Sequence, residues 1–277
     1  MEDSTLTFYK MSGSGNDFIL VDNRSRIVDE ENLTEWIASI CRRRHAVGAD
    51  GFILIEPSKR ADFKWRFFNA DGGEVEMCGN GGRCAARLAY LKGIAGSRLR
   101  FETKAGLIQA EVSGKRVKLE MPQPTTPELD YSIKVEEEAF TVSSMMVGVP
   151  HVVIWVNDLA TAPVCKAGRA IRYHERYAPA GTNVNFVQPL ENGTLAIRTY
   201  ERGVEDETLA CGTGSVAGAI VAAEKGMAAS PTALQTAGGE LLQVYFEKDG
   251  DDFCNVYLEG EARMIYEGRL WKEAAWQ

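Results

Sequence analysis

The chain has 277 residues, of which 45% are hydrophobic and 25% charged, and a net charge of −8 at pH 7. This length suits two domains of roughly 130 residues, each able to bury a core. The acidic balance argues against nucleic-acid or anionic-membrane partners. Neither an apolar run of the roughly 18–20 residues that span a membrane nor an apolar signal segment in the first residues is present. We therefore expect a cytoplasmic protein.

Most predicted strands are short, β-branched and separated by turn residues. Helical periodicity is confined to residues 31–44, 80–92, 166–177 and 213–225. The helices at 80–92 and 213–225 are rich in Ala, Gly and Leu all round, which predicts burial on every side. Three prolines in residues 121–127 predict a linker, and a last strand at 263–271 is expected to complete the first domain.

The second half of the chain repeats the first in the same order. Residues 78–93 and 211–226 align without a gap and share seven of sixteen positions. Loop-and-strand segments at 11–22, 48–54 and 102–112 recur at 146–157, 181–187 and 235–245. Such a duplication predicts two similar domains, residues 1–122 (completed by 264–277) and residues 123–263, with the active site in the cleft between them.

The six cysteines are too few and too scattered for a disulfide scaffold. They form no Cys-x-x-Cys pair, and the three histidines form no ligand cluster, so the sequence predicts no metal site. We expect Cys41, Cys165 and Cys254 to be buried small hydrophobes.

Cys78 and Cys211 occupy equivalent positions, each before Gly-x-Gly and a helix. A helix N-terminus offers free N–H groups and a positive dipole end, which lower a thiol pKa. The same groups form a site for an anion such as a carboxylate. If the two copies pack about a pseudo-two-fold axis, the two thiols face each other across one small anionic ligand.

Two opposed thiols can invert a carbon next to a carboxylate, with one acting as base and the other as acid. Backbone donors at both helix ends would stabilise the charge that develops on the carboxylate. This scheme needs neither pyridoxal phosphate nor a metal. Two other interpretations stay open: both cysteines could be structural helix caps, or the pair could form a redox disulfide. Gly-x-Gly alone is weak evidence for nucleotide binding.

These motifs resemble the diaminopimelate epimerase family over nearly the whole chain. They are Gly15-Asn-Asp-Phe18, residues 68–84 with Cys78-Gly-Asn-Gly-Gly-Arg-Cys84, Gly181-Thr-Asn-Val-Asn-Phe186, Tyr200-Glu-Arg-Gly203 and Ala210-Cys-Gly-Thr-Gly214. The resemblance implies two pseudo-symmetric α/β domains, each a curled mixed or antiparallel sheet around a central helix. It further implies a cofactor-independent isomerase of lysine and peptidoglycan biosynthesis that interconverts LL- and meso-2,6-diaminopimelate and forms a homodimer.

Matched position by position, the resemblance makes Cys78 and Cys211 the acid/base pair. It implies that the reacting carboxylate binds the backbone N–H groups of Gly79, Asn80, Gly212 and Thr213. It also implies substrate contacts from Asn16, Asn69, Asn183, Glu201 and Arg202, with His151 near the reacting centre. Arg202 would bind the distal carboxylate, for which a guanidinium is suited. Without the resemblance, the asparagines would be interpreted as turn residues, Arg202 as a surface charge and His151 as structural.

Three positions depart from a common pattern of the family. Ser12 replaces a frequent His, Gly51 an occasional Gln, and Val149 a frequent Asn. These departures leave the thiol chemistry intact but bear on substrate preference. The alternatives are a racemase of another amino acid such as histidine or proline, a phenazine-biosynthesis-like isomerase, or a non-catalytic protein that binds anionic amino acids.

Overall fold

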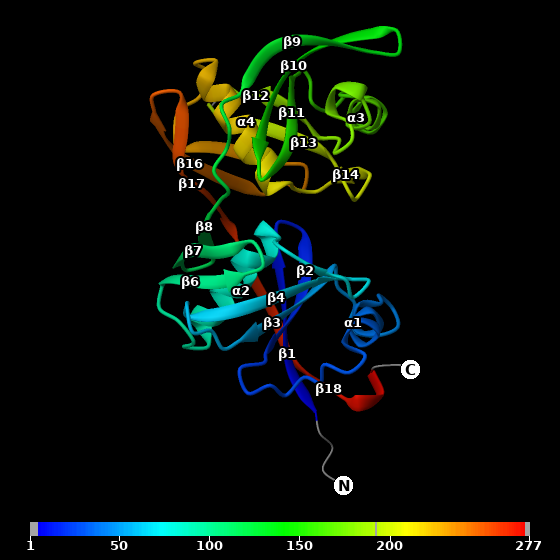
Figure 1. The fold of residues 1–277 in the computed structure, drawn as a ribbon, viewed down its shortest axis with the longest axis vertical. Helices are drawn as coiled ribbons and strands as arrows, with labels where there is room; N and C mark the ends of the chain where they lie inside the picture. Colours follow the sequence, from blue (N-terminus) through cyan, green and yellow to red (C-terminus); the bar gives the residue numbers. More distant parts are fainter. Residues whose placement is uncertain (1–4, 192, 275–277) are drawn as a thin grey trace. The chain divides into compact units, whose positions relative to one another are not determined.

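The computed structural model describes residues 5–191 and 193–274. The described chain forms two compact units (Figure 1). Unit 1 comprises the residues up to Leu119 together with those from Glu261 onward, and unit 2 comprises Glu120–Gly260. No helix in the described ranges is long and apolar enough to cross a membrane.

Unit 1 contains a curved sheet and two α-helices among its described residues. Its elements are β1 (Leu6–Gly13), β2 (Asn16–Asp22), α1 (Leu33–Cys41), β3 (Gly51–Glu56), β4 (Phe63–Asn69), β5 (Glu74–Val75), α2 (Gly79–Leu91), β6 (Arg98–Thr103), β7 (Gly106–Ser113), β8 (Arg116–Glu120), β18 (Arg263–Leu270) and the 3-10 helix Lys272–Ala274.

Unit 2 repeats this plan. Its elements are β9 (Glu128–Val135), β10 (Glu138–Val147), β11 (Val149–Trp155), α3 (Val164–Arg172), the 3-10 helix Glu175–Tyr177, β12 (Asn183–Pro189), β13 (Leu195–Glu201), β14 (Asp206–Thr208), α4 (Gly212–Glu224), β15 (Thr232–Thr236), β16 (Leu241–Asp249) and β17 (Asp252–Glu261).

The pairing of the strands is the same in both units. In unit 1, antiparallel pairs join β18 to β1, β1 to β2, β3 to β4, β6 to β7 and β7 to β8, while β2–β3 and β4–β6 are parallel. In unit 2, antiparallel pairs join β9 to β10, β10 to β11, β12 to β13, β15 to β16 and β16 to β17, while β11–β12 and β13–β15 are parallel. The predicted duplication and mixed sheet are therefore confirmed.

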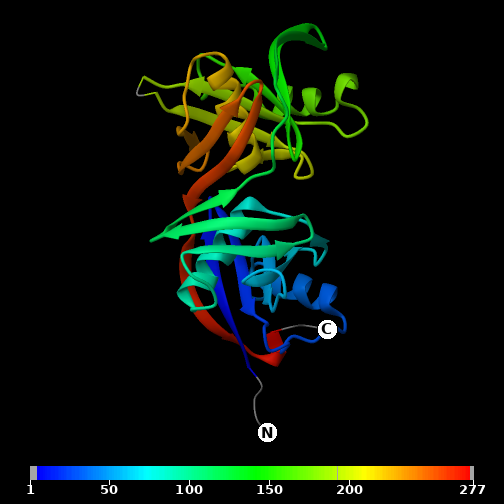
Figure 2. The same cartoon turned by 60° about the vertical axis from the view of Figure 1, so that its left-hand side comes forward.

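The C-terminal strand β18 has the same place in the sheet of unit 1 as β9 has in unit 2, since β18 pairs with β1 and β9 with β10. It runs antiparallel to β1, from Leu6 opposite Leu270 to Ser12 opposite Arg263. Both views show this strand, in red, beside the blue β1 (Figures 1 and 2). The first copy therefore obtains its outermost strand from the other end of the chain.

Each unit buries its principal helix within the curve of the sheet. In unit 1, Cys84, Ala85 and Leu88 of α2 pack in one core with Trp65 and Phe101 of the sheet. In unit 2, α4 is buried from Gly214 to Ala222, and its Val216 and Ile220 share a core with Leu234 and Leu258. Small residues along α4 and in the first turns of α2 allow strands to approach closely. The expected burial on every side fails for the last turn of α2, where Tyr90 and Leu91 are 42% and 47% exposed. The smaller helices α1 and α3 pack in separate cores.

Three expectations about the helices and cysteines need correction. The first helix covers only Leu33–Cys41, and the predicted helix at 166–177 is α3 followed by a 3-10 turn. Cys165 is exposed and Cys254 is half-buried, whereas Cys41 is buried as expected. Helix α3 buries Val164, Ala167, Gly168 and Ile171, a spacing that leaves Cys165 outside the buried stripe. The predicted linker also packs on unit 2, where Pro124 bridges to Val147.

The same bidentate ion pair closes the hairpin that leads to each central helix. In unit 1, Arg66 on β4 donates to Glu74 on β5, with Nε–Oε1 3.2 Å and Nη2–Oε2 3.3 Å. In unit 2, Arg198 on β13 donates to Glu207 on β14 at 2.6 Å through both atoms. Each clamped glutamate precedes its cysteine by four residues. The clamps thus hold the chain just before Cys78 and Cys211 in place.

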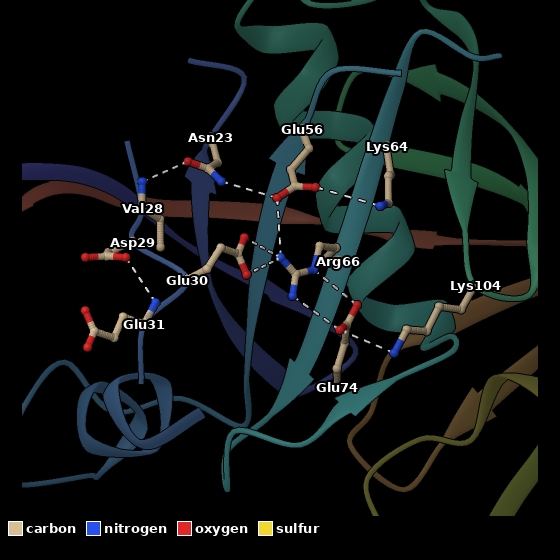
Figure 3. A network of polar contacts seen from close by, with 10 residues as sticks. All are labelled: Asn23, Val28, Asp29, Glu30, Glu31, Glu56, Lys64, Arg66, Glu74 and Lys104. Carbon is tan, nitrogen blue, oxygen red and sulfur yellow. Dashed lines mark hydrogen bonds and ion pairs between the residues drawn. The ribbon is translucent and has the colours of Figure 1, made fainter. Parts of the chain in front are cut away.

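Arg66 is also the centre of a wider polar network (Figure 3). Its Nη1 donates to both carboxylate oxygens of Glu30, at 2.7 and 2.9 Å, and lies 3.6 Å from Glu56. Lys104 reaches Glu74 at 3.3 Å from the other side. Burial raises the pKa of Glu74, but the hydrogen bonds and charge of Arg66 outweigh it and hold the pKa below its usual 4.5.

We predict that Arg66→Met lowers the free energy of unfolding by about 1–3 kcal/mol, because it leaves three carboxylates without their shared cation. Since the pKa of Glu74 is lowered on folding, the stabilisation is present above its usual value of 4.5 and is lost as the pH falls below it. Urea unfolding at neutral and at acidic pH should therefore show a difference that shrinks in acid.

The matched control is Arg60→Met, because Arg60 is 66% exposed and pairs with Glu102 only at 3.5 Å. Its effect should stay within about 0.5 kcal/mol. Equal stability of the two variants at neutral pH would contradict the prediction.

Candidate functional site

Both repeated cysteines are the last extended residue before a central helix. Cys78 caps α2 with φ −145° and ψ 116°, and Cys211 caps α4 with φ −117° and ψ 112°. Their carbonyl oxygens accept the first helical hydrogen bonds, from Gly82 N at 2.8 Å and Ser215 N at 2.9 Å. The N–H groups of the next residues are therefore first-turn donors at the positive end of a helix.

The cysteines differ in their surroundings. Cys78 is half-buried, whereas Cys211 is buried, with its Sγ 3.6 Å from Thr213 Oγ1. Cys84, six residues past Cys78, is buried in the core of unit 1. A carbon added to Gly13 would lie 3.3 Å from its sulfur, so Cys84 fills space under the β1–β2 turn.

In unit 1 the structure brings Asn16 and Asn80 together at the start of α2. Asn80 Nδ2 donates to Asn16 Oδ1 at 2.6 Å, and Asn16 Nδ2 donates to Asp50 Oδ2 at 3.2 Å. Arg83, which is fully buried, donates to Asn80 Oδ1 at 2.9 Å and to the Ser14 hydroxyl. A donor-only guanidinium at one end and an acceptor-only carboxylate at the other fix the direction of both amides.

Charged residues hold the loop at the far end of this relay. Arg43 donates to Asp50 at 2.8 Å and to Asp17, and Lys10 forms an ion pair with Asp17 at 2.8 Å. Burial raises the pKa of Asp17, but hydrogen bonds from Arg43 and Lys10 bring it down to about 2. Asp17 is therefore ionised at neutral pH, and its contacts with Arg43 and Lys10 hold the chain in place next to Asn16.

Asn69 lies apart from this relay, exposed at the end of β4, and its cross-strand partner is Gly51. A carbon added to Gly51 would come within 2.8 Å of the Phe68 carbonyl oxygen. No larger residue fits there without a shift of the backbone. The close packing of β3 on β4 therefore requires glycine at position 51, where some members of the family have Gln.

In unit 2 the side chain of Asn183 is held by backbone groups. Its Oδ1 accepts from Arg202 N at 2.8 Å, and its Nδ2 donates to Pro150 O at 3.2 Å. Arg202 in turn donates from Nη1 to Ala180 O at 3.2 Å. These bonds join the starts of β11 and β12 to the turn after β13, and so bring Asn183, Arg202 and His151 close together.

Glu201, the last residue of β13, is a carboxyl group in a poorly solvated place. Its Oε2 accepts from the Thr208 hydroxyl at 2.7 Å. Burial raises the pKa of Glu201 above its usual 4.5, and the Thr208 hydrogen bond opposes this only in part. A half-buried carboxyl group whose pKa is raised and whose hydrogen-bond partner is neutral is suited to a site that supplies a cation.

The expected residues are divided between the two units. Unit 1 holds Asn16, Asn69, Cys78, Gly79 and Asn80; unit 2 holds His151, Asn183, Glu201, Arg202, Cys211, Gly212 and Thr213.

Residues that orient these groups were missed by the sequence analysis, namely Asp50, Arg83, Asn185 and Thr208. Asn185 carried a signal, because a polar residue in an otherwise apolar strand must find partners when buried.

The chain matches the family model described as diaminopimelate epimerase over residues 8–126 and 143–265. The two matched segments fall on the two copies of the duplicated fold.

Relatives of nearly the same length carry the same name. A diaminopimelate epimerase of Aquifex aeolicus (strain VF5) is 45% identical, over 97% of this chain and 99% of the relative. One of Hydrogenobaculum sp. (strain Y04AAS1) is 48% identical, over 94% and 97%. One of Archaeoglobus fulgidus is 40% identical, over 96% of each.

Solved structures share the fold at low sequence identity. A phenazine biosynthesis protein of the PhzF family from Bacillus anthracis has a TM-score of 0.74 at 18% identity, covering 96% of this chain and 99% of that one. A hydroxyproline epimerase from Agrobacterium vitis has a TM-score of 0.69 at 14% identity, covering 99% and 95%.

We predict that Glu201→Gln stabilises the protein at pH 8 by about 0.5–1.5 kcal/mol, because it removes a charge that is poorly solvated in the folded state, and that it reduces activity. Because folding raises the pKa of Glu201, the cost of its charge is absent below the usual 4.5 and complete above the folded pKa. The gain should therefore vanish in acid.

Thermal unfolding across this pH range measures the effect. Glu137→Gln is the control, since the Glu137 side chain is 97% exposed. A gain in stability that is the same at all pH values, or that Glu137→Gln shares, would contradict the raised pKa of Glu201.

Proposed function

The chain belongs to the diaminopimelate epimerase family, and we propose that it interconverts LL- and meso-2,6-diaminopimelate with Cys78 and Cys211 as its acid/base pair. The observation that carries the proposal is the position of each cysteine directly before a thirteen-residue helix in a duplicated unit. Relatives that are 40–48% identical over almost their whole length support the choice of substrate.

The reaction transfers one proton at each face of the α-carbon. One cysteine, as thiolate, removes the α-proton and becomes a thiol, and the electron pair is delocalised into the carboxylate. The other cysteine, as thiol, gives its proton to the opposite face of the carbon and becomes a thiolate. The carbon is inverted, no redox change occurs, and the two cysteines have exchanged roles for the reverse reaction.

The charge that develops on the reacting carboxylate needs donors that are already in position. We propose that the first-turn N–H groups of Gly79, Asn80, Gly212 and Thr213 supply them. Apart from its chain neighbours and its own helix backbone, a carbon added to Gly79 would meet no described atom within 4 Å, which supports open access to the start of α2. This arrangement requires the two units to close on the substrate, and that closure is part of the proposal.

The distal end of the substrate carries a second carboxylate and an ammonium group. We propose that Arg202 binds this carboxylate and that Glu201 receives an ammonium group or lies beside a catalytic thiol. The amides of Asn16, Asn69 and Asn183 complete the polar contacts, with His151 near the reacting centre. Ser12, Gly51 and Val149 are the positions that would tune this end.

A racemase of another amino acid is the second candidate, but it is not favoured. Proline-type and phenazine-type relatives in the structural comparison are only 14–18% identical, which is a likeness of fold alone. A binding protein would not need a thiol before each central helix. Since both sulfurs must stay reduced, we propose that the protein works in a reducing compartment, the cytoplasm.

The test of the proposed reaction is proton NMR of LL-diaminopimelate with the protein in D₂O, with a reductant and without pyridoxal phosphate. The α-proton signal should disappear as the meso isomer grows. Cys78→Ala and Cys211→Ala should each reduce kcat by about 100–10,000-fold or more, because each removes an acid/base group.

Cys165→Ala is the matched control, since Cys165 is exposed on α3, and it should keep full activity. Exchange that survives the loss of either Cys78 or Cys211 would refute the two-thiol mechanism. No exchange in the wild type would move the substrate to another amino acid.

We further propose that the protein is a homodimer. Strand β18 supports this, because Ile265 and Tyr266 are 53% and 44% exposed on it, and large exposed apolar side chains often mark an interface. Sedimentation velocity should show twice the mass of one chain for the wild type and a shift toward the monomer for Ile265→Glu. Lys134→Glu is the control, since Lys134 is a polar position on β9 whose side chain is 71% exposed, and it should stay dimeric. A monomeric wild type would contradict the proposal.

A further inference from the structure

The imidazole of His151 is one of the most enclosed polar groups of unit 2. The residue is 0% exposed, and among the described residues its Nε2 has no hydrogen-bond partner. Its Nδ1 lies 3.2 Å from Asn185 Nδ2 on the neighbouring strand β12. Buried polar atoms without a partner are rare in folded proteins. The contact at Nδ1 determines which of the two ring nitrogens carries the proton.

The orientation of the Asn185 amide is not open to choice. Its nitrogen lies 2.8 Å from the Val152 carbonyl oxygen, which can only accept a hydrogen bond. Its oxygen lies 2.9 Å from the Thr199 hydroxyl, which can donate. A flipped amide would set two carbonyl oxygens against each other. Asn185 therefore presents an N–H to His151.

It follows that Nδ1 of His151 accepts and that the single ring proton of the neutral imidazole sits on Nε2. Burial lowers the pKa of His151 to about 3, and the positive charge of Arg202 adds to this. The strand neighbours that pair with His151, Met145 on β10 and Asn183 on β12, carry no charge. The one lone pair of the neutral ring, at Nδ1, is engaged by Asn185, and the charge that acts on the ring is that of Arg202, which disfavours the imidazolium.

The His151–Asn185 pair lies directly against the start of α4. A carbon added to Gly214 would overlap Asn185 Oδ1 and would lie 3.3 Å from Cys211 Cβ. The second glycine of Cys211-Gly-Thr-Gly is therefore required by the amide of Asn185. At the equivalent Gly81 of unit 1 the nearest atom would be the Ile53 methyl carbon, at 3.2 Å. The amide thus links the imidazole to the helix turn that carries Cys211.

We propose that Asn185 is a positioning residue that locks His151 as the Nε2–H tautomer, so that the imidazole takes part as a hydrogen-bond donor and not as a third proton acceptor. This inference rests on the proposed function. In a site that moves one proton between two thiols, an imidazole with an open lone pair would compete for that proton. With Nδ1 occupied by Asn185, only the N–H edge is available to an anionic group.

The direct test is ¹⁵N NMR of the protein labelled at histidine, which has only three rings to resolve. The Nδ1 of His151 should give the signal of an unprotonated nitrogen and Nε2 that of a protonated one, unchanged between about pH 5 and 8. His174 is an internal reference, because its Nδ1 accepts from Arg176 N and its Nε2 faces the Lys134 carbonyl oxygen. A protonated Nδ1 on His151 would overturn the proposal whether or not the protein is active.

The variant test is Asn185→Asp, which keeps the shape but turns the donor into an acceptor. Nδ1 should then become protonated, and the kcat of α-proton exchange should fall by about 10–100-fold, the usual loss when a residue that orients a functional histidine is changed. KM should change less than kcat. Asn157→Asp is the matched control, since Asn157 is exposed just beyond β11, and it should change neither.

A second pair of variants tests whether His151 acts as a hydrogen-bond donor or as a base. His151→Gln retains a neutral N–H donor and should keep more activity than His151→Leu, which has none. Equal loss in both, or full activity of Asn185→Asp with a protonated Nδ1, would refute the inference while leaving the epimerase proposal intact. Loss of exchange in the wild type would refute the epimerase proposal but not the tautomer.

Discussion

The constraint on which the structure depends is the burial of one small-residue helix inside each curled sheet. Helices α2 and α4 contact strands on several sides of their unit, so the position of the helix is set by the whole sheet. The packing of the buried turns also holds the start of each helix in place. Because Cys78 and Cys211 are the capping residues, their sulfurs, the first-turn N–H groups and the dipole are placed by packing and not by a flexible loop.

The clamps extend this rigidity to the chain that enters each helix. A hairpin as short as β4–β5 or β13–β14 gives few backbone hydrogen bonds, so a bidentate Arg–Glu pair has a large share in holding it. In unit 1 the arginine also gathers Glu30 and Glu56, whereas in unit 2 Arg198 bonds the carbonyl oxygen of Leu159. The ion pair is common to both units, and its surroundings are not.

Much of the fold could be predicted because a duplication shows itself as a repeated order of motifs, which survives even where few residues match. The position of each cysteine at the start of a helix could be predicted, because Gly-x-Gly and a run of small residues follow it in both copies. The partners of the site residues could not. Arg83 reaches Ser14 across 69 positions of sequence and Asn185 reaches His151 across 34, and no local pattern encodes such pairs. The prediction that Cys165 is buried was wrong for a local reason, because the buried stripe of helix α3 does not include it.

The two units share the same fold, but different side chains hold the candidate site residues in each. The counterpart of His151 in unit 1 is Phe18, since His151 pairs with Asn183 in β12 as Phe18 pairs with Gly51 in β3, and Asn16 is the counterpart of Val149. Asn16 belongs to a relay that ends in two charges, Arg83 and Asp50, and it shows both a donor and an acceptor. His151 is held by the neutral Asn185, in a strand with no charged partner, and it shows a donor only. A symmetric pair of thiols therefore lies in asymmetric surroundings. In the proposed reaction only one end of the diaminopimelate lies between the thiols. The surroundings must therefore bind the reacting and the distal end differently, while the two proposed acid/base groups stay interchangeable.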